Sequence, residues 1–345
     1  MRRLLLVLLF SVCIADEVKV LIPRGIGVGD VAKILKKQDL IRSITWFKIR
    51  AKLSGRRPIF YSGLMRLNVP ASTSSLIRQL QERDRLTYYK ITVPEGYHVL
   101  QIDQLLSESG LLKKGEFQAF VASPNCFRTM LESSPSLSII PKTISTLEGY
   151  LFPDTYFLDG LSTPYEIAQK MLLNFSSKVA PLYLQYQQVQ PHRGKRSSLK
   201  MKSTDYYSVL IIASIVENEA KLDEERPLVA SVYLNRLRLH MALGSCPTVH
   251  YARAQQGLPH EETISLVDLK IDSPYNTYRH AGLPPSPISN PGIRSIQATL
   301  YPSQTDYLYF VSLRNGHHHF SKSGREHAQW VSKVSRESVS QPLRR

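Results

Sequence analysis

The sequence predicts an α+β protein, with a small αβ module near the N-terminus and a larger mixed α+β domain after it. Two short segments, 18–41 and 89–112, share one pattern: a strand ends in a Pro-x-Gly turn and a helix follows. Beyond residue 113, helical apolar spacing alternates with turn-rich loops and short strands. Because domains usually contain about 100–200 residues, a chain of 345 residues suits two or three of them.

The segment 1–16 has the features of a signal peptide or a short membrane anchor. Arg2 and Arg3 precede an apolar stretch from Leu4 to Ala15. Such a stretch is short for a transmembrane helix, which needs ~20 residues, and suits a signal peptide better. In either case we expect the two arginines to stay in the cytoplasm and the rest of the chain to cross the membrane.

The predicted module, 17–112, contains the two copies of the turn. Ile22-Pro23-Arg24-Gly25 is the first copy and Val93-Pro94-Glu95-Gly96 is the second. Residues 60–70 between them are typical of a strand or hairpin with a glycine break. Since a strand, a turn and a helix form a common local unit, the repeat predicts ligand binding without a catalytic signature.

The predicted larger domain, 113–335, contains a series of helices and loops. Helical spacing is found over about 114–134, 164–190 and 206–222, and again at 227–239 and 293–301. Pro227 is expected to begin its helix, because proline suits the first turn. Aromatic, basic and proline-rich loops are expected at 147–158, 190–205 and 273–292. A strand at 307–313 and a basic tail at 336–345 complete the order.

The composition narrows the classes of partner and cofactor. The formal net charge of +16 favours anionic partners or a basic soluble surface. No zinc-finger spacing, P-loop or RNA-binding aromatic motif accompanies this charge, so nucleic acid is not an expected partner. Cys126 and Cys246 either form a disulfide or remain free thiols. The run His317-His318-His319 lacks nearby ligands at metal-binding spacing, so we expect no metal and no cofactor.

The stretch IIASIVENEA, 211–220, ends an apolar helical run on an acid, Glu217. Spacing alone favours an ordinary surface pair with Lys221, four residues on, worth about 0.3–0.5 kcal/mol. The alternative is an acid at the edge of a poorly solvated cleft, where burial disfavours the charged form and the side chain donates a proton near neutral pH. Glu219 points to another face of the helix.

Two loops combine aromatic and polar side chains in a way typical of sugar binding. Glu148, Tyr150, Asp154 and Tyr156 lie in the first, and Tyr275, Asn276 and Tyr278 lie in the second. Ring faces stack on sugars, and carboxylates accept hydrogen bonds from hydroxyl groups. The alternative for the first loop is a core turn whose aromatic rings pack inward, and for the second a rigid crossover set by its prolines.

Several motifs closely resemble the endolytic murein transglycosylases, the YceG-like family. They follow one another in the order of the family: LEGYLFPDTY (147–156), ASIVENEA (213–220), ERPLVASVYLNRLRLHMAL (225–243), PTVHYA (247–252), DSPYNTYRHAGLPPSPISNPG (272–292) and YLYFVSLRNGHHHF (307–320). The resemblance implies a LysM-like N-terminal module and a YceG-like catalytic domain. It also implies an enzyme anchored in the inner membrane, facing the periplasm.

The resemblance implies that Glu217 is catalytic and acts first as general acid and then as general base. The substrate is the glycan strand of peptidoglycan, the product is a 1,6-anhydro-N-acetylmuramic end, and the implied partners are peptidoglycan synthases. The candidate substrate contacts within the motifs are Glu148, Tyr150, Asp154, Tyr156, Asn235, Tyr275, Asn276, Thr277, Tyr278 and His318.

Two alternatives and one departure accompany this resemblance. A lysozyme-like hydrolase would use Glu217 with Glu148, and a peptidoglycan-binding scaffold would have lost catalysis. Gly244 and Cys246 stand where the family usually has a glutamine and an aspartate. If these two positions face the glycan groove, restoring both side chains strengthens binding by about one hydrogen bond each, ~0.5–1.5 kcal/mol.

Overall fold

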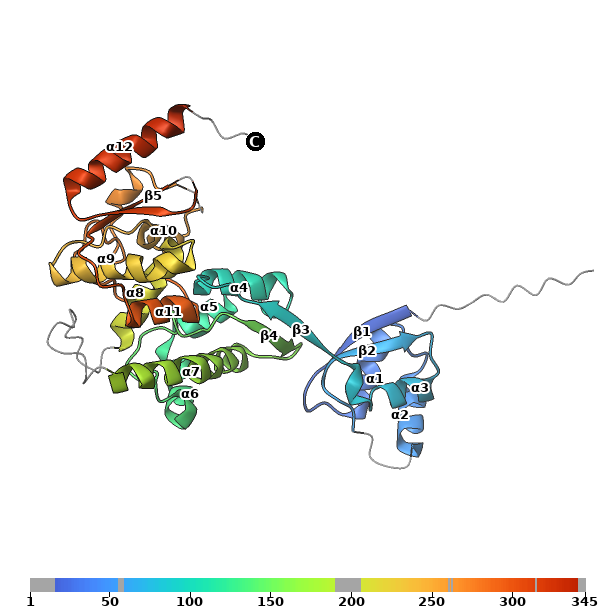
Figure 1. Cartoon of the computed structure of the whole chain (residues 1–345). Coiled ribbons are helices and arrows are strands. Elements are labelled where there is room, and N and C mark those ends of the chain that lie inside the picture. Colours follow the sequence, from blue (N-terminus) through green and yellow to red (C-terminus); the bar gives the residue numbers. More distant parts are fainter. Residues whose placement is uncertain are drawn as a thin grey trace, which may run out of the picture. The chain divides into compact units, whose positions relative to one another are not determined.

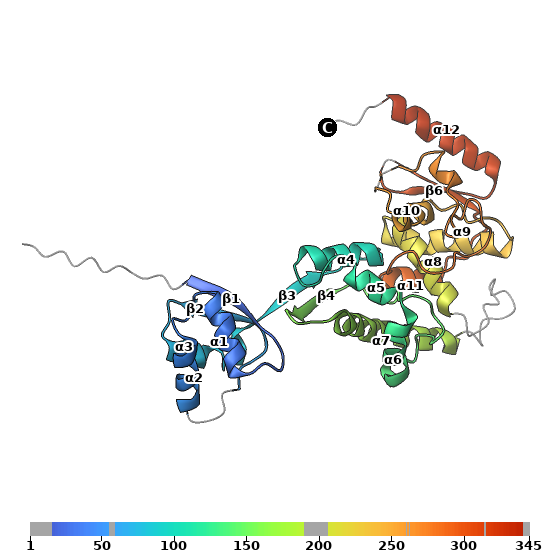
Figure 2. The same ribbon diagram turned by 180° about the vertical axis from the view of Figure 1, so that it is seen from behind.

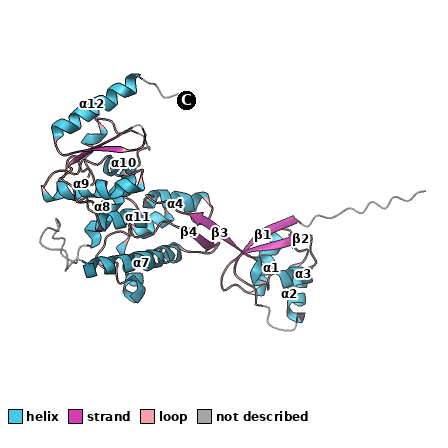
Figure 3. Cartoon of the chain, viewed as in Figure 1, coloured by secondary structure: helices cyan, strands magenta, loops and turns pink. Residues whose placement is uncertain are grey.

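The computed structural model of the chain describes residues 16–54, 59–189, 206–259, 261, 263–313 and 315–340 (Figure 1). Residues 1–15 of the targeting segment predicted at 1–16 lie outside these ranges, and so does the whole of the basic loop predicted at 190–205. Helices predominate, and β1–β2, β2–β3 and β5–β6 pair antiparallel, which confirms the predicted α+β class (Figure 3). Within the described ranges no helix is both long and apolar enough to span a membrane.

The chain forms two compact units. The first contains the residues up to Lys90 together with 157–162, and the second contains 91–156 and the residues from 163 onward. The boundary therefore precedes the one that we predicted at 112. The reason is that the buried Asp103 accepts hydrogen bonds from the backbone N–H groups of Gly115, Phe117 and Gln118, which ties the preceding segment to the second unit.

The first unit has the order strand, helix, helix, strand, helix, strand. It comprises β1 (Asp16–Ile22), α1 (Val28–Lys37), α2 (Ile44–Leu53), β2 (Gly63–Val69), α3 (Thr73–Gln79) and the beginning of β3 (Leu86–Thr92). β1 and β2 pair over their whole length, from Asp16 opposite Val69 to Ile22 opposite Gly63. Alternate residues of both strands, such as Val20 and Met65, pack on the helices in a buried core.

The second unit contains most of the helices. In chain order they are α4 (Val99–Glu108), α5 (Glu116–Val121), α6 (Pro124–Ser133), α7 (Pro164–Val189), α8 (Tyr206–Glu219), α9 (Arg226–Arg238), α10 (Cys246–Gln255), α11 (Ile293–Leu300) and α12 (Gly324–Ser340). The strands are β4 (Thr155–Asp159), which extends into the first unit, β5 (Tyr309–Ser312) and β6 (His318–Ser321).

Helix α8 is the central element of the second unit. Because Ile211 to Val216 are all apolar or small, the helix buries every side of this run between α9 and α11 (Figure 2). The apolar partners include Val229 and Tyr233 of α9. The buried run ends at Val216, so the next residue, Glu217, emerges at the edge of the core.

Both copies of the predicted strand–turn–helix unit are present. The first joins β1 to α1, and the second joins β3 to α4. Gly25 and Gly96 have φ angles of 74° and 80°, in the left-handed region that glycine tolerates. The two copies belong to different units, and the second copy brings Glu95 into the unit that contains Glu217.

Candidate active site

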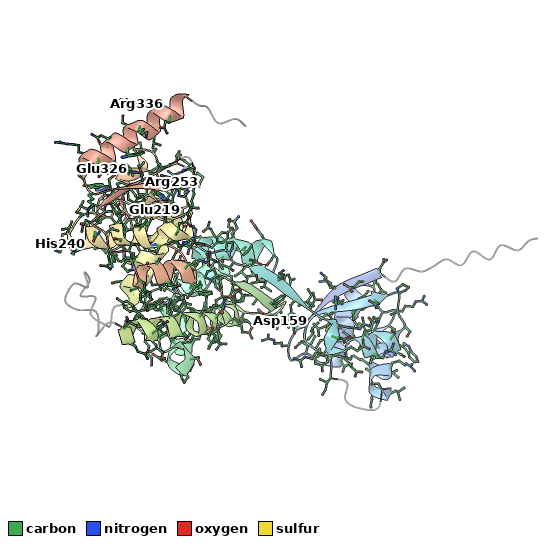
Figure 4. The ribbon with its side chains drawn as sticks, viewed as in Figure 1. Asp159, Glu219, His240, Arg253, Glu326 and Arg336 are labelled. Carbon is green, nitrogen blue, oxygen red and sulfur yellow. The ribbon has the colours of Figure 1, made fainter. Side chains whose placement is uncertain are left out.

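A cavity of about 730 Å³ lies within the second unit, beside the C-terminal end of α8. One wall is the turn before α4 and the first turns of that helix, and another is α10. The polar side chains that line it are Glu95, Tyr97, His98, Gln101, Gln104, Glu217, Asn218, His250, Tyr251 and Arg253. Of these residues, Figure 4 labels Arg253, which belongs to α10. The lining is rich in neutral hydrogen-bonding groups, which suit a ligand with many hydroxyl and amide groups.

Glu217 lies on the cavity wall with both carboxylate oxygens hydrogen-bonded. Oε1 accepts from Nη1 of Arg226 over 2.9 Å, and Oε2 accepts from the backbone N–H of Gly292 over 2.8 Å. Only 5% of the Glu217 side chain is exposed. The acid therefore pairs with Arg226 and not with Lys221, and its surroundings are polar where the sequence suggested an apolar cleft. Ala213 and Ala220, four residues before and three residues after Glu217, are buried in the core.

Arg226 is held in place by further partners at the start of α9. Its Nε donates to Oδ1 of Asp223 over 2.9 Å, and its Nη1 also donates to the hydroxyl of Ser295 on α11. The guanidinium is buried. A fixed, buried cation beside Glu217 compensates the negative charge of its carboxylate.

A second carboxylate, Glu95, shares this corner of the cavity. A Cβ atom added to Gly292 would lie 2.0 Å from Oε1 of Glu95, so the glycine allows that side chain to approach. The N–H of the same glycine donates to Glu217. Burial raises the pKa of Glu95, and the negative charge of Glu217 raises it further. Glu95 and Glu217 thus lie on either side of one glycine.

The turn that carries Glu95 is fixed to the loop before α11. The N–H of Gly96 donates to the carbonyl of Asn290 over 3.0 Å, and the N–H of Asn290 donates to the carbonyl of Tyr97 over 2.9 Å. The buried side chain of Asn290 accepts from the N–H groups of Gly149 and Leu151, over 2.9 Å each. Three chain segments are therefore joined behind the cavity.

Glu148 is buried behind the cavity wall, with 1% of its surface exposed. It accepts hydrogen bonds from the N–H of Val99, the amide of Asn290 and the hydroxyl of Tyr251. Burial raises the pKa of Glu148 to about 8, against the opposing effect of these donors. Glu148 does not belong to the described lining of the cavity. Its hydrogen bonds instead hold the first turn of α4 and the side chain of Tyr251 in place.

The other predicted contacts of the first loop also lie away from the lining. Tyr150 is fully buried against Phe175, and Tyr156 receives a hydrogen bond from Asn174. Asp154 pairs with Lys178 over 2.8 Å, which lowers its pKa to about 2. Tyr150, Asp154 and Tyr156 therefore hold the loop and β4 against α7. This is the alternative of an inward-packed core turn that the sequence left open.

The second loop is likewise held by internal bonds. Asn276 is buried and donates to the carbonyls of Leu269 and Ile271, and Thr277 is buried against Thr248. Tyr275 packs its ring on Tyr251, with the centroids 4.8 Å apart, so it supports the cavity from behind. In α9, the amide of Asn235 donates to the carbonyls of Thr305 and Tyr307.

Glu219 belongs to a different network from Glu217, as the helical geometry predicted. Its Oε1 accepts from the hydroxyls of Tyr233 and Ser245, over 2.8 and 3.0 Å. Burial raises the pKa of Glu219. Cys246 is an exposed free thiol that contacts the hydroxyl of Tyr278 over 3.2 Å, and Cys126 is also free, so the two do not form a disulfide. Gly244 and Cys246 do not appear in the described lining of the cavity.

The histidine run is held by a carboxylate. The backbone N–H and Nδ1 of His318 bond to Glu225, and Nδ1 of His317 lies 3.2 Å from the same carboxylate. His318 is buried at the side chain, 4% exposed. Although burial opposes it, this bonding lowers the pKa of Glu225. In the described part of the chain no group of three potential ligand side chains is arranged for a metal ion.

Of the side chains proposed from the sequence, Glu217 alone belongs to the described lining of the cavity. None of the other lining residues was proposed from the sequence as part of the site. Glu95 is the most consequential of these residues, because it is a second carboxylate in the lining that contains Glu217. It was overlooked because a Pro-x-Gly turn is common local structure. One signal was available: the second copy of the turn has Glu95 where the first has Arg24. His250 and Tyr251 lie in the PTVHYA motif, but neither was singled out.

Comparison with known proteins gives consistent matches over almost the whole chain. The model of the YceG-like family matches residues 20–333. The chain is 33% identical over 314 residues to the endolytic murein transglycosylase of Bacillus subtilis (strain 168), covering 90% of this chain and 82% of that protein. It is 30% identical over 334 residues to the endolytic murein transglycosylase of Streptococcus pneumoniae (strain D39), covering 57% of that protein.

A solved structure is also similar. The crystal structure of a YceG-like protein from Listeria monocytogenes superposes with a TM-score of 0.60 at 32% sequence identity. The match covers 92% of this chain and 99% of the Listeria chain.

Proposed function

This chain belongs to the YceG-like family, and from this membership and the cavity beside α8 we propose that it is an endolytic murein transglycosylase. It cleaves the bond between N-acetylmuramic acid and N-acetylglucosamine within glycan strands and leaves a 1,6-anhydro-N-acetylmuramic end. The observation that carries the proposal is the position of Glu217, the carboxylate identified by the family motif, on the wall of a large polar cavity.

The reaction requires two proton transfers and consumes no water. The glycosidic oxygen gains a proton as its bond to C1 of the muramyl ring breaks, and the 6-hydroxyl loses a proton as its oxygen closes onto C1. Glu217 accepts two N–H donors, as a carboxylate does, and Arg226 compensates its charge. This arrangement suits the second transfer, in which Glu217 acts as general base on the 6-hydroxyl.

The cavity lining supports a sugar ligand. His98, Gln101 and His250 present hydrogen-bond donors and acceptors, and Tyr251 presents an aromatic ring that packs against the ring of Tyr275. Side chains of these types bind hydroxyl and N-acetyl groups without requiring a charged ligand. The volume of about 730 Å³ lies in the range of ordinary ligand pockets, about 300–1,000 Å³.

A hydrolase that pairs Glu217 with Glu148 is disfavoured by the burial of Glu148. Mass spectrometry of the products of uncrosslinked glycan strands distinguishes the classes of function. A transglycosylase yields anhydro-muramyl ends, a hydrolase yields reducing ends, and a scaffold binds strands without cleaving them. Reducing ends from the purified chain would refute the proposed function.

The first unit is proposed to position glycan and to carry no chemistry, as a LysM-like module would. It has a groove of about 950 Å³ next to the exposed ring of Trp46, which lies near the guanidinium of Arg50. Ser72, Thr73 and Ser74 add hydroxyl groups to the lining. An exposed aromatic ring beside hydroxyl groups is a surface on which a sugar ring stacks.

We also propose that the chain acts at the periplasmic face of the inner membrane and cooperates with peptidoglycan synthases. The support for the location is the positively charged start and apolar stretch of residues 1–16, and the support for the synthases is the family resemblance. Protease added to spheroplasts should digest the chain after residue 16. Protection until the membrane is permeabilised would contradict this location.

A further inference from the structure

We propose that Glu95 is a second catalytic carboxylate, which donates the proton that cleaves the glycosidic bond while Glu217 removes the proton from the 6-hydroxyl. The inference rests on the proposed transglycosylase function and divides between two residues the steps that the family resemblance assigns to Glu217 alone.

The first argument is the position of the two acids. Both line the same cavity, and both contact Gly292: its N–H bonds to Glu217, and its Cα hydrogens face the carboxylate of Glu95. The turn that follows Glu95 also lies beside Glu217, since a Cβ atom on Gly96 would lie 3.5 Å from Cγ of Glu217, an ordinary van der Waals contact. Two acids fixed this near to each other can act on the two ends of one reaction.

The second argument is the hydrogen bonding of Glu217. One of its oxygens accepts from a buried, permanently charged guanidinium and the other from a backbone N–H. Both contacts are those of a carboxylate acceptor, and the charge-assisted bond to Arg226 is strong only while Glu217 is ionised. A residue held in this way is prepared to accept a proton, so the proton for the first step requires another donor.

The third argument is the environment of Glu95. It is partly buried, which raises its pKa, and the negative charge of Glu217 raises that pKa further, against the opposing effect of the cations Arg226 and Arg294. The other titratable groups of the shared lining are Tyr97, His98, His250, Tyr251 and Arg253. Two neighbouring carboxylates do not both ionise readily. Because Arg226 donates directly to Glu217, we assign the acid role to Glu95.

The steps balance without any further reactant. The proton of Glu95 moves to the glycosidic oxygen, and the electron pair of the C1–oxygen bond leaves with that oxygen. The 6-hydroxyl oxygen then forms its bond to C1, and its proton moves to Glu217. Glu95 ends as a carboxylate and Glu217 as an acid, and proton exchange through the open cavity restores the starting state.

The leaving group provides a direct test. A 2,4-dinitrophenyl glycoside of a muramyl-containing disaccharide has a leaving group that departs without protonation, but ring closure still requires a base. In the full chain, Glu95→Gln should lower the cleavage of uncrosslinked glycan strands about 10²–10⁴-fold while keeping the activated glycoside within about tenfold of wild type. Glu217→Gln should lose both activities.

A matched control and a second variant accompany this test. Glu132→Gln removes one negative charge from an exposed position of α6, outside the described lining of the cavity, and should leave both activities unchanged. Gly292→Ala places a methyl group against Glu95 without removing the carboxylate, and it should impair strands more than the activated glycoside. If Glu95→Gln does not fold, Gly292→Ala therefore tests whether Glu95 is the proton donor.

Each outcome bears on the proposal. If Glu95→Gln cleaves strands at near wild-type rate, or loses both substrates equally, Glu95 is not the proton donor. The same holds for Gly292→Ala when it stands in as the deciding variant. Anhydro ends from the wild-type chain show that the proposed function holds even where Glu95 fails; their absence overturns the proposed function itself.

Discussion

The guanidinium of Arg226 donates to the carboxylate of Glu217 over 2.9 Å, and the two side chains are 9% and 5% exposed. Removing one partner of such a buried pair leaves the other charge uncompensated. This relationship connects the stability of the second unit with the chemistry of the cavity.

Arg226→Leu should therefore lower the free energy of unfolding by about 3–5 kcal/mol, and activity on glycan strands should fall with it. Urea unfolding followed by circular dichroism measures the first effect. In a chain that already carries Glu217→Gln, the same substitution should cost less, because the buried negative charge is gone. An equal loss in both backgrounds would contradict the coupling of these two residues.

The buried acid Glu148 predicts a pH dependence of stability. Its pKa rises from 4.5 to about 8 on folding, so its contribution is fully present below pH 4.5 and is lost as the pH rises to about 8. Between these values the free energy of unfolding of wild type should fall relative to that of Glu148→Gln, which does not titrate. Parallel curves for the two proteins in urea unfolding at pH 5 and pH 8 would refute this prediction.

The sequence predicted the helices of the second unit better than the roles of its loops. Apolar spacing located α4, α7, α8 and α11, because burying one stripe or all of a helix is a periodic requirement. The loop at 147–158 has a composition that suits either a sugar site or a core turn. Glu148 and Tyr150 are buried, so the loop is a core turn. The composition of a loop does not show which of its side chains are buried, so the sequence could not decide between the two.

Trp46 is predicted to contribute to glycan binding without a part in the chemistry. Trp46→Ala should weaken binding to sacculi in a sedimentation assay by several fold, while the products of cleavage keep their anhydro ends. Trp330→Ala is the matched control, because that ring stacks on His319 within the second unit. Unchanged binding by Trp46→Ala would show that the groove of the first unit does not bind glycan.

Gly244 is predicted to be a structural glycine. Its φ of 57° is left-handed, and a Cβ atom there would lie 3.2 Å from Nη1 of Arg236. Gly244→Gln should lower the free energy of unfolding by about 1–2 kcal/mol and should not strengthen glycan binding, in contrast to the expectation from the family motif. Cys246→Ser, at an exposed neighbour, should leave stability nearly unchanged. Tighter binding by Gly244→Gln would restore the original interpretation.

Glu95 illustrates a limit of sequence reasoning at this site. An acid in a Pro-x-Gly turn is usually solvent-exposed, and about 120 residues separate it from Glu217, so no local pattern joins them. The two acids meet at a third segment: Asn290 bonds to the turn that carries Glu95, and Gly292 contacts both carboxylates. Comparison of the two copies of the turn offers the one clue, since only the second carries an acid.

The central claim is that Glu217 is the catalytic carboxylate, and the product profile of Glu217→Gln on uncrosslinked glycan strands tests it most directly. Glutamine keeps the shape of the side chain but neither gives nor takes the proton, so anhydro-muramyl ends should fall at least about 10²–10⁴-fold. Glu219→Gln, two residues along the same helix, should retain those products. Anhydro ends formed by Glu217→Gln at near wild-type rate would contradict the account.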